Sequence, residues 1–135
     1  MIQAPVNHKS RTVLCVDDQI ENLQLLQAII EYHGDVFYGA MSGEEAIDLA
    51  IRVQPRLVLL DVQMPGMDGF ETCRQLRGLF ALREVPIAFL TARKSGPDVQ
   101  EGIKAGGNDF LSKPFDPDKL IARIDHWASR RLAVA

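Results

Sequence analysis

Short apolar runs alternate along this chain with stretches of helical periodicity, and this alternation constrains the fold more than any other feature. The runs are Val13–Val16, Val36–Ala40, Leu57–Leu60, Ile87–Leu90 and Phe110–Leu111. Connections between parallel strands are right-handed, so strand–helix units in series place helices on both faces of one sheet. Leu57–Leu60 is apolar throughout, as expected for a strand that is covered on both sides. We therefore predict an α/β fold with a single doubly wound, five-stranded parallel sheet and helices on both faces.

Periodicity and capping residues place the helices between these strands. The first helix is predicted from apolar residues at three- and four-residue spacing, followed by Gly34: Ile20, Leu23, Leu26 and Ile30. Later helix starts are marked by Ser42, Asp68, Ser95 and Asp116. Ser42 and Glu45 have the spacing of a capping box, and Pro117 suits the first position of the last helix. We expect the helix after Ser95 to be short.

The size and charge of the chain exclude several classes of protein. It has 135 residues and a formal net charge of −3, which indicates one domain and argues against direct nucleic-acid binding, because that requires a basic surface. The longest apolar run is too short to span a bilayer and no export signal is visible, so we expect a cytoplasmic protein without membrane association. We predict a flexible leader over 1–10, a folded domain over 11–131, and a tail or the start of a linker over 132–135.

Polar residues follow the predicted strands at the point where each strand ends. They are Asp17, Asp18, Asp61, Thr91 and Lys113. In a doubly wound sheet the carboxyl ends of the strands form the ligand-binding edge, so we expect these side chains to meet. Two carboxylates ~4 Å apart repel each other by about 4 kcal/mol at an effective dielectric constant of about 20. An all-oxygen site without histidine or thiolate suits magnesium or another hard cation, which would offset that repulsion.

The remaining two groups suit a phosphoryl ligand. The Lys113 ammonium is a point charge that fits a phosphoryl oxygen, and the Thr91 hydroxyl can donate a hydrogen bond to one. The set therefore fits an aspartate that accepts a phosphoryl group while a metal ion and a lysine neutralise the transferred charge.

Four motifs, in this order and at these strand ends, carry a family resemblance. They are Val16-Asp17-Asp18, the segment from Leu60 to Gly69 (LDVQMPGMDG), Leu90-Thr91-Ala92 and Lys113-Pro114-Phe115. With them the chain resembles the receiver domain of two-component response regulators, including chemotaxis regulators, over Arg11 to Arg131. The resemblance implies the flavodoxin-like (βα)5 form of the predicted fold and a phosphorylation-dependent signalling switch.

The resemblance implies a role for each matching position of the site. Asp61 corresponds to the phosphoacceptor, and Asp18 would bind magnesium (or manganese) directly, with Asp17 binding mainly through water. Gln63 would give its backbone carbonyl to the metal. Lys113 would bridge the acidic cluster at rest and the phosphoryl group afterwards.

The resemblance also implies how the signal is read out. Thr91 corresponds to the switch hydroxyl and Phe110 to the switch aromatic, whose movement reshapes the face of the fourth helix, fifth strand and fifth helix. A cis peptide bond is expected between Lys113 and Pro114. Side chains at Gln63 and Arg93 would tune how fast water removes the phosphoryl group.

Partners follow from the same resemblance. The donor would be a sensor histidine kinase or a histidine phosphotransfer protein, and the target an output domain or a downstream protein. The domain would catalyse only its own phosphorylation and dephosphorylation. A homodimer on phosphorylation is one further expectation, for which Arg123 and Asp109 could supply ion pairs.

Three other functions are open to a chain of this pattern. A phosphatase of the haloacid dehalogenase type also phosphorylates an aspartate at a strand end, but it needs a second aspartate two residues on, where this chain has Gln63. A flavodoxin-like nucleotide carrier needs a phosphate loop after the first strand, where Asp17 and Asp18 would repel phosphate. A constitutive docking module that is not phosphorylated would be expected to lack the acceptor, the lysine or the acidic pair.

Overall fold

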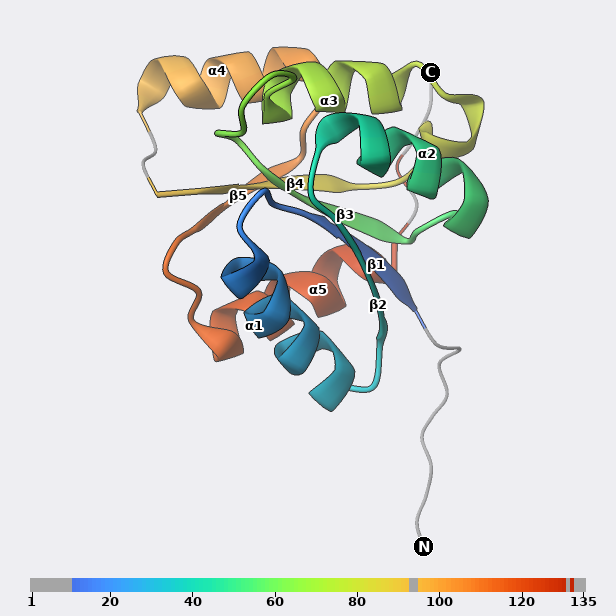
Figure 1. Cartoon of the computed structure of the whole chain (residues 1–135), viewed down its shortest axis with the longest axis vertical. Coiled ribbons are helices and arrows are strands. Elements are labelled where there is room, and N and C mark those ends of the chain that lie inside the picture. The colour runs from blue at the N-terminus through green and yellow to red at the C-terminus, as the bar shows by residue number, and fades with distance from the viewer. Residues whose placement is uncertain (1–10, 93–94, 131, 133–135) are drawn as a thin grey trace, which may run out of the picture.

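One parallel sheet forms the centre of the molecule, with its strands in the order β2-β1-β3-β4-β5 (Figure 1). The computed structural model describes residues 11–92, 95–130 and 132. The strands are β1 (Thr12–Val16), β2 (Val36–Ala40), β3 (Leu57–Asp61), β4 (Ile87–Thr91) and β5 (Asp109–Ser112). The helices are α1 (Ile20–Tyr32), α2 (Gly43–Val53), α3 (Gly69–Arg77), the 3-10 turn η1 (Phe80–Leu82), α4 (Gly96–Ala105) and α5 (Pro117–Ala128). The predicted doubly wound fold is confirmed.

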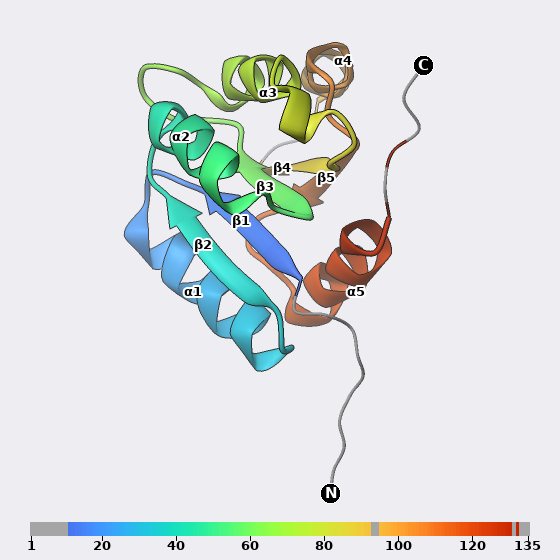
Figure 2. The same cartoon turned by 90° about the vertical axis from the view of Figure 1, so that its right-hand side faces the viewer.

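Helices cover both faces of the sheet and divide the core into two layers. Figure 2 shows α1 and α5 on one side of the strands, with α2, α3 and α4 on the other. Successive residues of a strand point to opposite faces, so Leu14 and Val16 of β1 belong to the core under α2 to α4. Val13 and Cys15 belong to the core under α1 and α5. Both layers draw on the same strands, which explains why the strand sequences are continuously apolar.

The predicted helix starts are confirmed by their capping hydrogen bonds. The Ser42 hydroxyl accepts from the Glu45 N–H, and the side chains of Asp68, Ser95 and Asp116 cap α3, α4 and α5 in the same way. The Glu45 carboxylate reaches back to the N–H of Met41 at 2.7 Å, one residue before the cap. The predicted strands agree with the observed ones to within one residue at each end.

Some sequence expectations need correction. Ile20 is 46% exposed, because it is the first residue of α1 and lies on its outer side. The helix after Ser95 has 10 residues and is not short. The turn η1 was not predicted, since three residues leave no periodic signal.

Within the described residues, no helix has the length and apolar character needed to cross a membrane. The predicted leader over 1–10 and Arg93 lie outside the described residues.

The strand order fixes where a ligand can bind. The chain passes from β1 outward to β2 and then returns to β3 on the other side of β1, so the order of the strands reverses between β1 and β3. Ligands of doubly wound sheets bind at the carboxyl ends of the strands beside such a reversal. The ends of β1 and β3 carry Asp17 and Asp61.

Candidate functional site at the carboxyl edge of the sheet

Three carboxylates meet at the carboxyl ends of β1 and β3. Val16 pairs with Leu60 across the two strands, which brings the residues that follow them side by side. One carboxylate oxygen from each of Asp17, Asp18 and Asp61 lies within 4.8 Å of the others. Asp17 is fully buried and Asp61 is 5% exposed. The predicted acidic cluster therefore forms, and little water reaches two of its members.

Lys113 joins the cluster from the loop after β5. Its Nζ donates to Asp17 Oδ2 and to Asp61 Oδ1, both at 3.0 Å. The Lys113 N–H donates to the Thr91 carbonyl at 2.9 Å, and the Lys113–Pro114 peptide bond is cis, as expected. Two of the three carboxylates, those of Asp17 and Asp61, thus share one ammonium group, and Asp18 adds a third negative charge beside them.

The pKa values of the cluster reflect burial and this shortage of positive charge. Burial raises the pKa of Asp61, the neighbouring Asp17 carboxylate raises it further, and the hydrogen bond from Lys113 only partly opposes the two. Burial alone would lower the pKa of Lys113, but its bonds to Asp61 and Asp17 outweigh that and raise it. The ammonium stays charged, and the carboxylates keep a surplus of negative charge that a cation would relieve.

Asp17 is held by two further donors besides the lysine. The Gln19 N–H donates to its Oδ1 at 2.9 Å, and Asn22 Nδ2 donates to its Oδ2 at 3.1 Å. Asn22 was not among the predicted site residues. The sequence feature that could have indicated it is its position: Asn22 lies five residues after Asp17, in the first turn of the helix that follows β1.

A cavity opens beside the acidic cluster and brings most of the predicted site residues together. It is lined by Asp18, Gln19, Asn22, Asp61, Gln63, Thr91, Ala92, Lys113 and Pro114. Thr91 ends β4 and is 7% exposed. The Gln63 N–H approaches Asp61 Oδ1 at 3.4 Å, while the residue itself is exposed at the rim.

The loop after Asp61 depends on two glycines. Gly66 has a φ of +74°, which residues with a side chain rarely adopt. A Cβ on Gly69 would lie 2.2 Å from the carbonyl oxygen of Asp61, because the Gly69 N–H turns back to the Val62 carbonyl at 2.9 Å. The start of α3 therefore packs directly on the end of β3.

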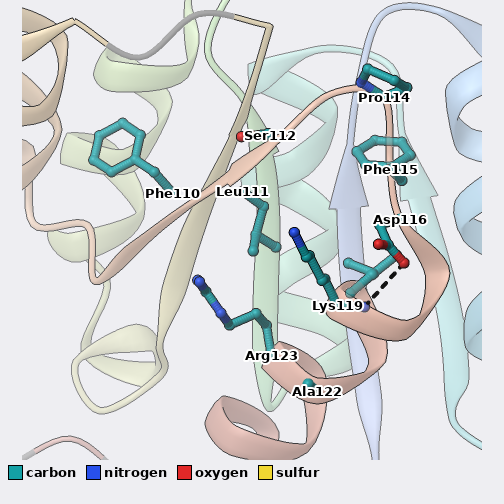
Figure 3. Close-up of a pocket in the computed structure, with 10 residues that line it drawn as sticks. Phe110, Leu111, Ser112, Pro114, Phe115, Asp116, Lys119, Ala122 and Arg123 are labelled. Carbon is teal, nitrogen blue, oxygen red and sulfur yellow. Dashed lines mark hydrogen bonds between the residues drawn. The ribbon is translucent and has the colours of Figure 1, made fainter.

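Phe110 does not line this cavity. It lies on β5, half-buried, with its ring centroid 5.2 Å from that of Phe89. A Cβ on Gly102 of α4 would come within 2.4 Å of the Phe110 ring, so the glycine leaves room for it. Phe110 also lines a groove between β5 and α5, together with Lys119 and Arg123. Figure 3 shows its ring directed away from these two side chains.

Arg123 and Asp109 pair with each other inside the chain. Arg123 Nη1 lies 2.5 Å from Asp109 Oδ2, and the indole N–H of Trp127 donates to the same oxygen at 2.8 Å. The role of these two charges in ion pairs across a dimer stays a prediction, since the structure shows their contacts within one chain.

Comparison with known proteins decides the family. The family model described as response regulator receiver domain matches residues 13–125. The chain belongs to this family. Receiver domains are signalling domains of two-component systems, and the four strand-end motifs lie at the edge where this receiver forms its cavity.

Individual relatives agree with the assignment. Response regulator PleD of Caulobacter vibrioides is 40% identical over 125 residues, which cover 93% of this chain and 28% of that protein. The receiver therefore spans little more than a quarter of this curated relative. Chemotaxis protein CheY4 of Vibrio cholerae has a TM-score of 0.86 at 31% identity, covering 88% of this chain and 99% of that one.

A third relative was solved with a bound cation. The receiver domain of sensor histidine kinase PA1611 from Pseudomonas aeruginosa has a TM-score of 0.82 at 29% identity, covering 90% of this chain and 99% of that one. That structure contains a magnesium ion coordinated in its active-site cleft.

Proposed function

We propose that this receiver is a phosphorylation-dependent switch that accepts a phosphoryl group on Asp61. The observation that carries the proposal is the pairing of a nearly buried Asp61, at the wall of an open cavity, with the ammonium of Lys113 at 3.0 Å. A carboxylate that must gain further negative charge needs a positive group already in place beside it. Lys113 supplies one such group, and the surplus acidity of Asp17 and Asp18 supports the binding of a second.

The donor set fits a hard divalent cation. We propose that Asp17, Asp18, Asp61 and the backbone carbonyl of Gln63 hold magnesium (or manganese), since all four offer oxygen ligands. The fit rests on the charge balance of this chain: carboxylate oxygens of three residues lie within 4.8 Å of one another, and Lys113 pairs with two of them. When bound, the cation would neutralise charge on the transferred phosphoryl oxygens.

The transfer forms one bond and breaks another. A carboxylate oxygen of Asp61 attacks the phosphorus of a phosphohistidine, the O–P bond forms, and the P–N bond breaks with its electron pair returning to the imidazole. The product is an acyl phosphate on Asp61. Lys113 leaves its bond to Asp17 and donates to a phosphoryl oxygen, and the Thr91 hydroxyl donates to another.

The proposed readout couples Thr91 to Phe110. Inward movement of Thr91 vacates space that the Phe110 ring takes up by changing rotamer, and the face formed by α4, β5 and α5 changes shape. Two features support this: Thr91 lines the cavity that receives the phosphoryl group, and Phe110 lies two strand positions from Ser112, the residue paired with Thr91.

We propose the partners and setting that go with this chemistry. The donor is a sensor histidine kinase or a histidine phosphotransfer protein in the cytoplasm, and residues 11–131 form the receiver. We propose that the donor histidine belongs to another protein, because His33 at the end of α1 and His126 in the last turn of α5 do not line the cavity. An output domain or a separate downstream protein receives the signal.

The rival functions lack support among the residues of the site. The position two residues after Asp61 holds Gln63, which cannot act as the general acid and base of a dehalogenase-type phosphatase. A docking module that is never phosphorylated would not need Lys113 within hydrogen-bonding distance of both Asp17 and Asp61, as it is here.

Acetyl phosphate and Mg²⁺ test the acceptor directly. The parent protein should gain the mass of one phosphoryl group, and Asp61→Asn should gain none. Asp48→Asn is the matched control, because Asp48 is an exposed carboxylate on α2, outside the site. An unmodified parent, or equal modification of parent and Asp61→Asn, would overturn the proposal.

The coupling of Thr91 to Phe110 has its own test. Thr91→Ala should still accept the phosphoryl group but lose most of the change in the NMR signals of Phe110 that phosphorylation causes in the parent. Thr12→Ala, a half-buried threonine at the other end of the sheet, should retain that change. Equal signal changes in Thr91→Ala and the parent would contradict the coupling.

A further inference from the structure

We infer that Asn22 is a positioning residue of this site, which holds the Asp17 carboxylate in place while Lys113 is engaged elsewhere. The inference rests on the proposed function and extends it to a residue of α1. It starts from one contact, the donation from Asn22 Nδ2 to Asp17 Oδ2 at 3.1 Å.

Asp17 depends on protein donors for its hydrogen bonds. It is fully buried, and a buried carboxylate without donors is strongly destabilised. Its Oδ1 accepts from the Gln19 N–H, and its Oδ2 accepts from Lys113 and from Asn22. The lysine and the asparagine are thus the two side chains that orient Oδ2.

These two donors have different roles in the proposed reaction. Lys113 also binds Asp61 Oδ1, and in the proposed reaction its ammonium leaves Asp17 and donates to a phosphoryl oxygen. Once it does so, Asn22 is the side-chain donor that remains on Asp17 Oδ2. Its amide is neutral, so it can fix the carboxylate without cancelling the negative charge that attracts a cation.

The backbone places Asn22 for this task. The residue lies in the first turn of α1, where its N–H donates to the Gln19 carbonyl at 3.1 Å. Its side chain lines the same cavity as Asp18 and Asp61. Groups that hydrogen-bond to metal-binding residues set the orientation of those residues, and their removal typically lowers metal affinity by about 10–100-fold.

Replacing Asn22 should therefore weaken Mg²⁺ binding. Asn22→Ala removes the donor, and Asn22→Leu removes it while keeping a side chain of similar size. We expect Mg²⁺ titrated into either variant by calorimetry to bind about tenfold more weakly than to the parent. With acetyl phosphate, the Mg²⁺ concentration for half-maximal phosphorylation should rise by a similar factor.

Controls separate positioning from a merely structural role. Gln24→Ala changes an exposed residue of the same helix and should leave Mg²⁺ affinity unchanged. A packing role would predict that Asn22→Leu restores the parent affinity, which would overturn the inference. Unchanged Mg²⁺ affinity in Asn22→Ala would overturn it too.

The outcome for Asn22 is distinguishable from the outcome for the proposed function. If the parent accepts the phosphoryl group and Asn22→Ala binds Mg²⁺ as tightly as the parent, the function stands and the inference fails. If Asn22→Ala and Asn22→Leu lose Mg²⁺ affinity while the parent is never phosphorylated, the positioning role stands and the proposed function fails.

Discussion

Charged side chains gather at both ends of the sheet, and the two groups differ in how their charges balance. At the carboxyl edge, Asp17 and Asp61 share the ammonium of Lys113, and the Asp18 carboxylate lies beside them. At the amino edge, the residue before β1 and the residue before β2 form an ion pair, Arg11 with Asp35. Both groups include fully buried carboxylates, so burial alone does not distinguish a functional site from a structural one.

The charged groups at the amino edge form hydrogen bonds with one another. Arg11 binds Asp35 through two hydrogen bonds of 3.0 Å each, and it also donates to Asp125 at 2.8 Å and to the Ser129 hydroxyl at 2.9 Å. The hydrogen bond to Asp35 raises the pKa of Arg11, and the Asp125 bond adds to this although burial opposes both. Because His33 also binds Asp125 at 2.9 Å, this group ties the end of α1 to α5. Its hydrogen bonds join residues of the chain to one another, as expected of a structural ion pair.

Surplus negative charge beside a cavity thus distinguishes the carboxyl edge, the proposed site, from the amino edge. The Arg11 guanidinium donates one N–H group to each oxygen of Asp35, so neither partner keeps an uncompensated charge that would bind a ligand. An ammonium that pairs with two carboxylates of a cluster of three leaves negative charge uncompensated, and that charge attracts a cation. Predictions that treat the two edges differently therefore test this interpretation.

The largest expected effect is at the amino edge. Arg11→Met leaves the Asp35 carboxylate buried without its partner, and breaking such a pair typically costs about 3–5 kcal/mol. We expect a loss of that size in the free energy of unfolding measured with urea, and Mg²⁺ should not restore it. Arg52→Met is the control, since the exposed Arg52–Asp48 pair at 3.7 Å should change stability by less than about 1 kcal/mol. Stability equal to that of Arg52→Met would contradict a structural role for Arg11.

The sequence predicts the charged cluster at the carboxyl edge but not the ion-pair group at the amino edge, and the reason is physical. Asp17, Asp61 and Lys113 each follow an apolar strand, and parallel strands bring their carboxyl ends to one edge, so local pattern was enough. Arg11 and Asp125 are 114 residues apart, and their contact depends on how α5 packs beside α1. Asn22 was not predicted as a site residue. Its position in the first turn of a helix places it near the end of β1, but the sequence does not show that its side chain donates to Asp17.

A smaller effect is expected at the carboxyl edge, and it should respond to magnesium. Lys113→Met removes the ammonium and leaves three carboxylates together, which should lower the free energy of unfolding by about 1–3 kcal/mol in the presence of a chelator. Mg²⁺ should recover part of this loss, because a cation that binds only the folded state stabilises it. Urea unfolding with and without Mg²⁺ measures both.

The control for Lys113→Met is Lys119→Met, an exposed lysine at the start of α5. It should change stability little under either condition. If Mg²⁺ stabilises Lys113→Met no more than it stabilises Arg11→Met, the two edges do not differ in the way their charges suggest.

The smallest effects concern pH, and here the two edges should differ in sign. Burial opposes ionisation of Asp125, but hydrogen bonds from Arg11 and His33 outweigh it and hold the pKa of Asp125 below its usual value. Its contribution to stability is then present above the unfolded pKa of about 3.9 and lost as the pH falls through the folded pKa. Asp125→Asn should cost a few tenths of a kcal/mol at neutral pH, because water screens this exposed carboxylate, and nothing in strong acid.

Asp61 should behave in the opposite way. Because burial and Asp17 raise its pKa, the ionised carboxylate destabilises the fold above the folded pKa, and this penalty vanishes below about pH 3.9, where the unfolded chain is protonated too. In the presence of a chelator, Asp61→Asn should be more stable than the parent at neutral pH, and the gain should fade on acidification. Urea unfolding of the parent and both variants between about pH 3 and pH 7 compares the two slopes. Differences of the same sign at the two edges would show that the carboxyl edge holds no surplus of negative charge, and the case for a cation there would lose its physical basis.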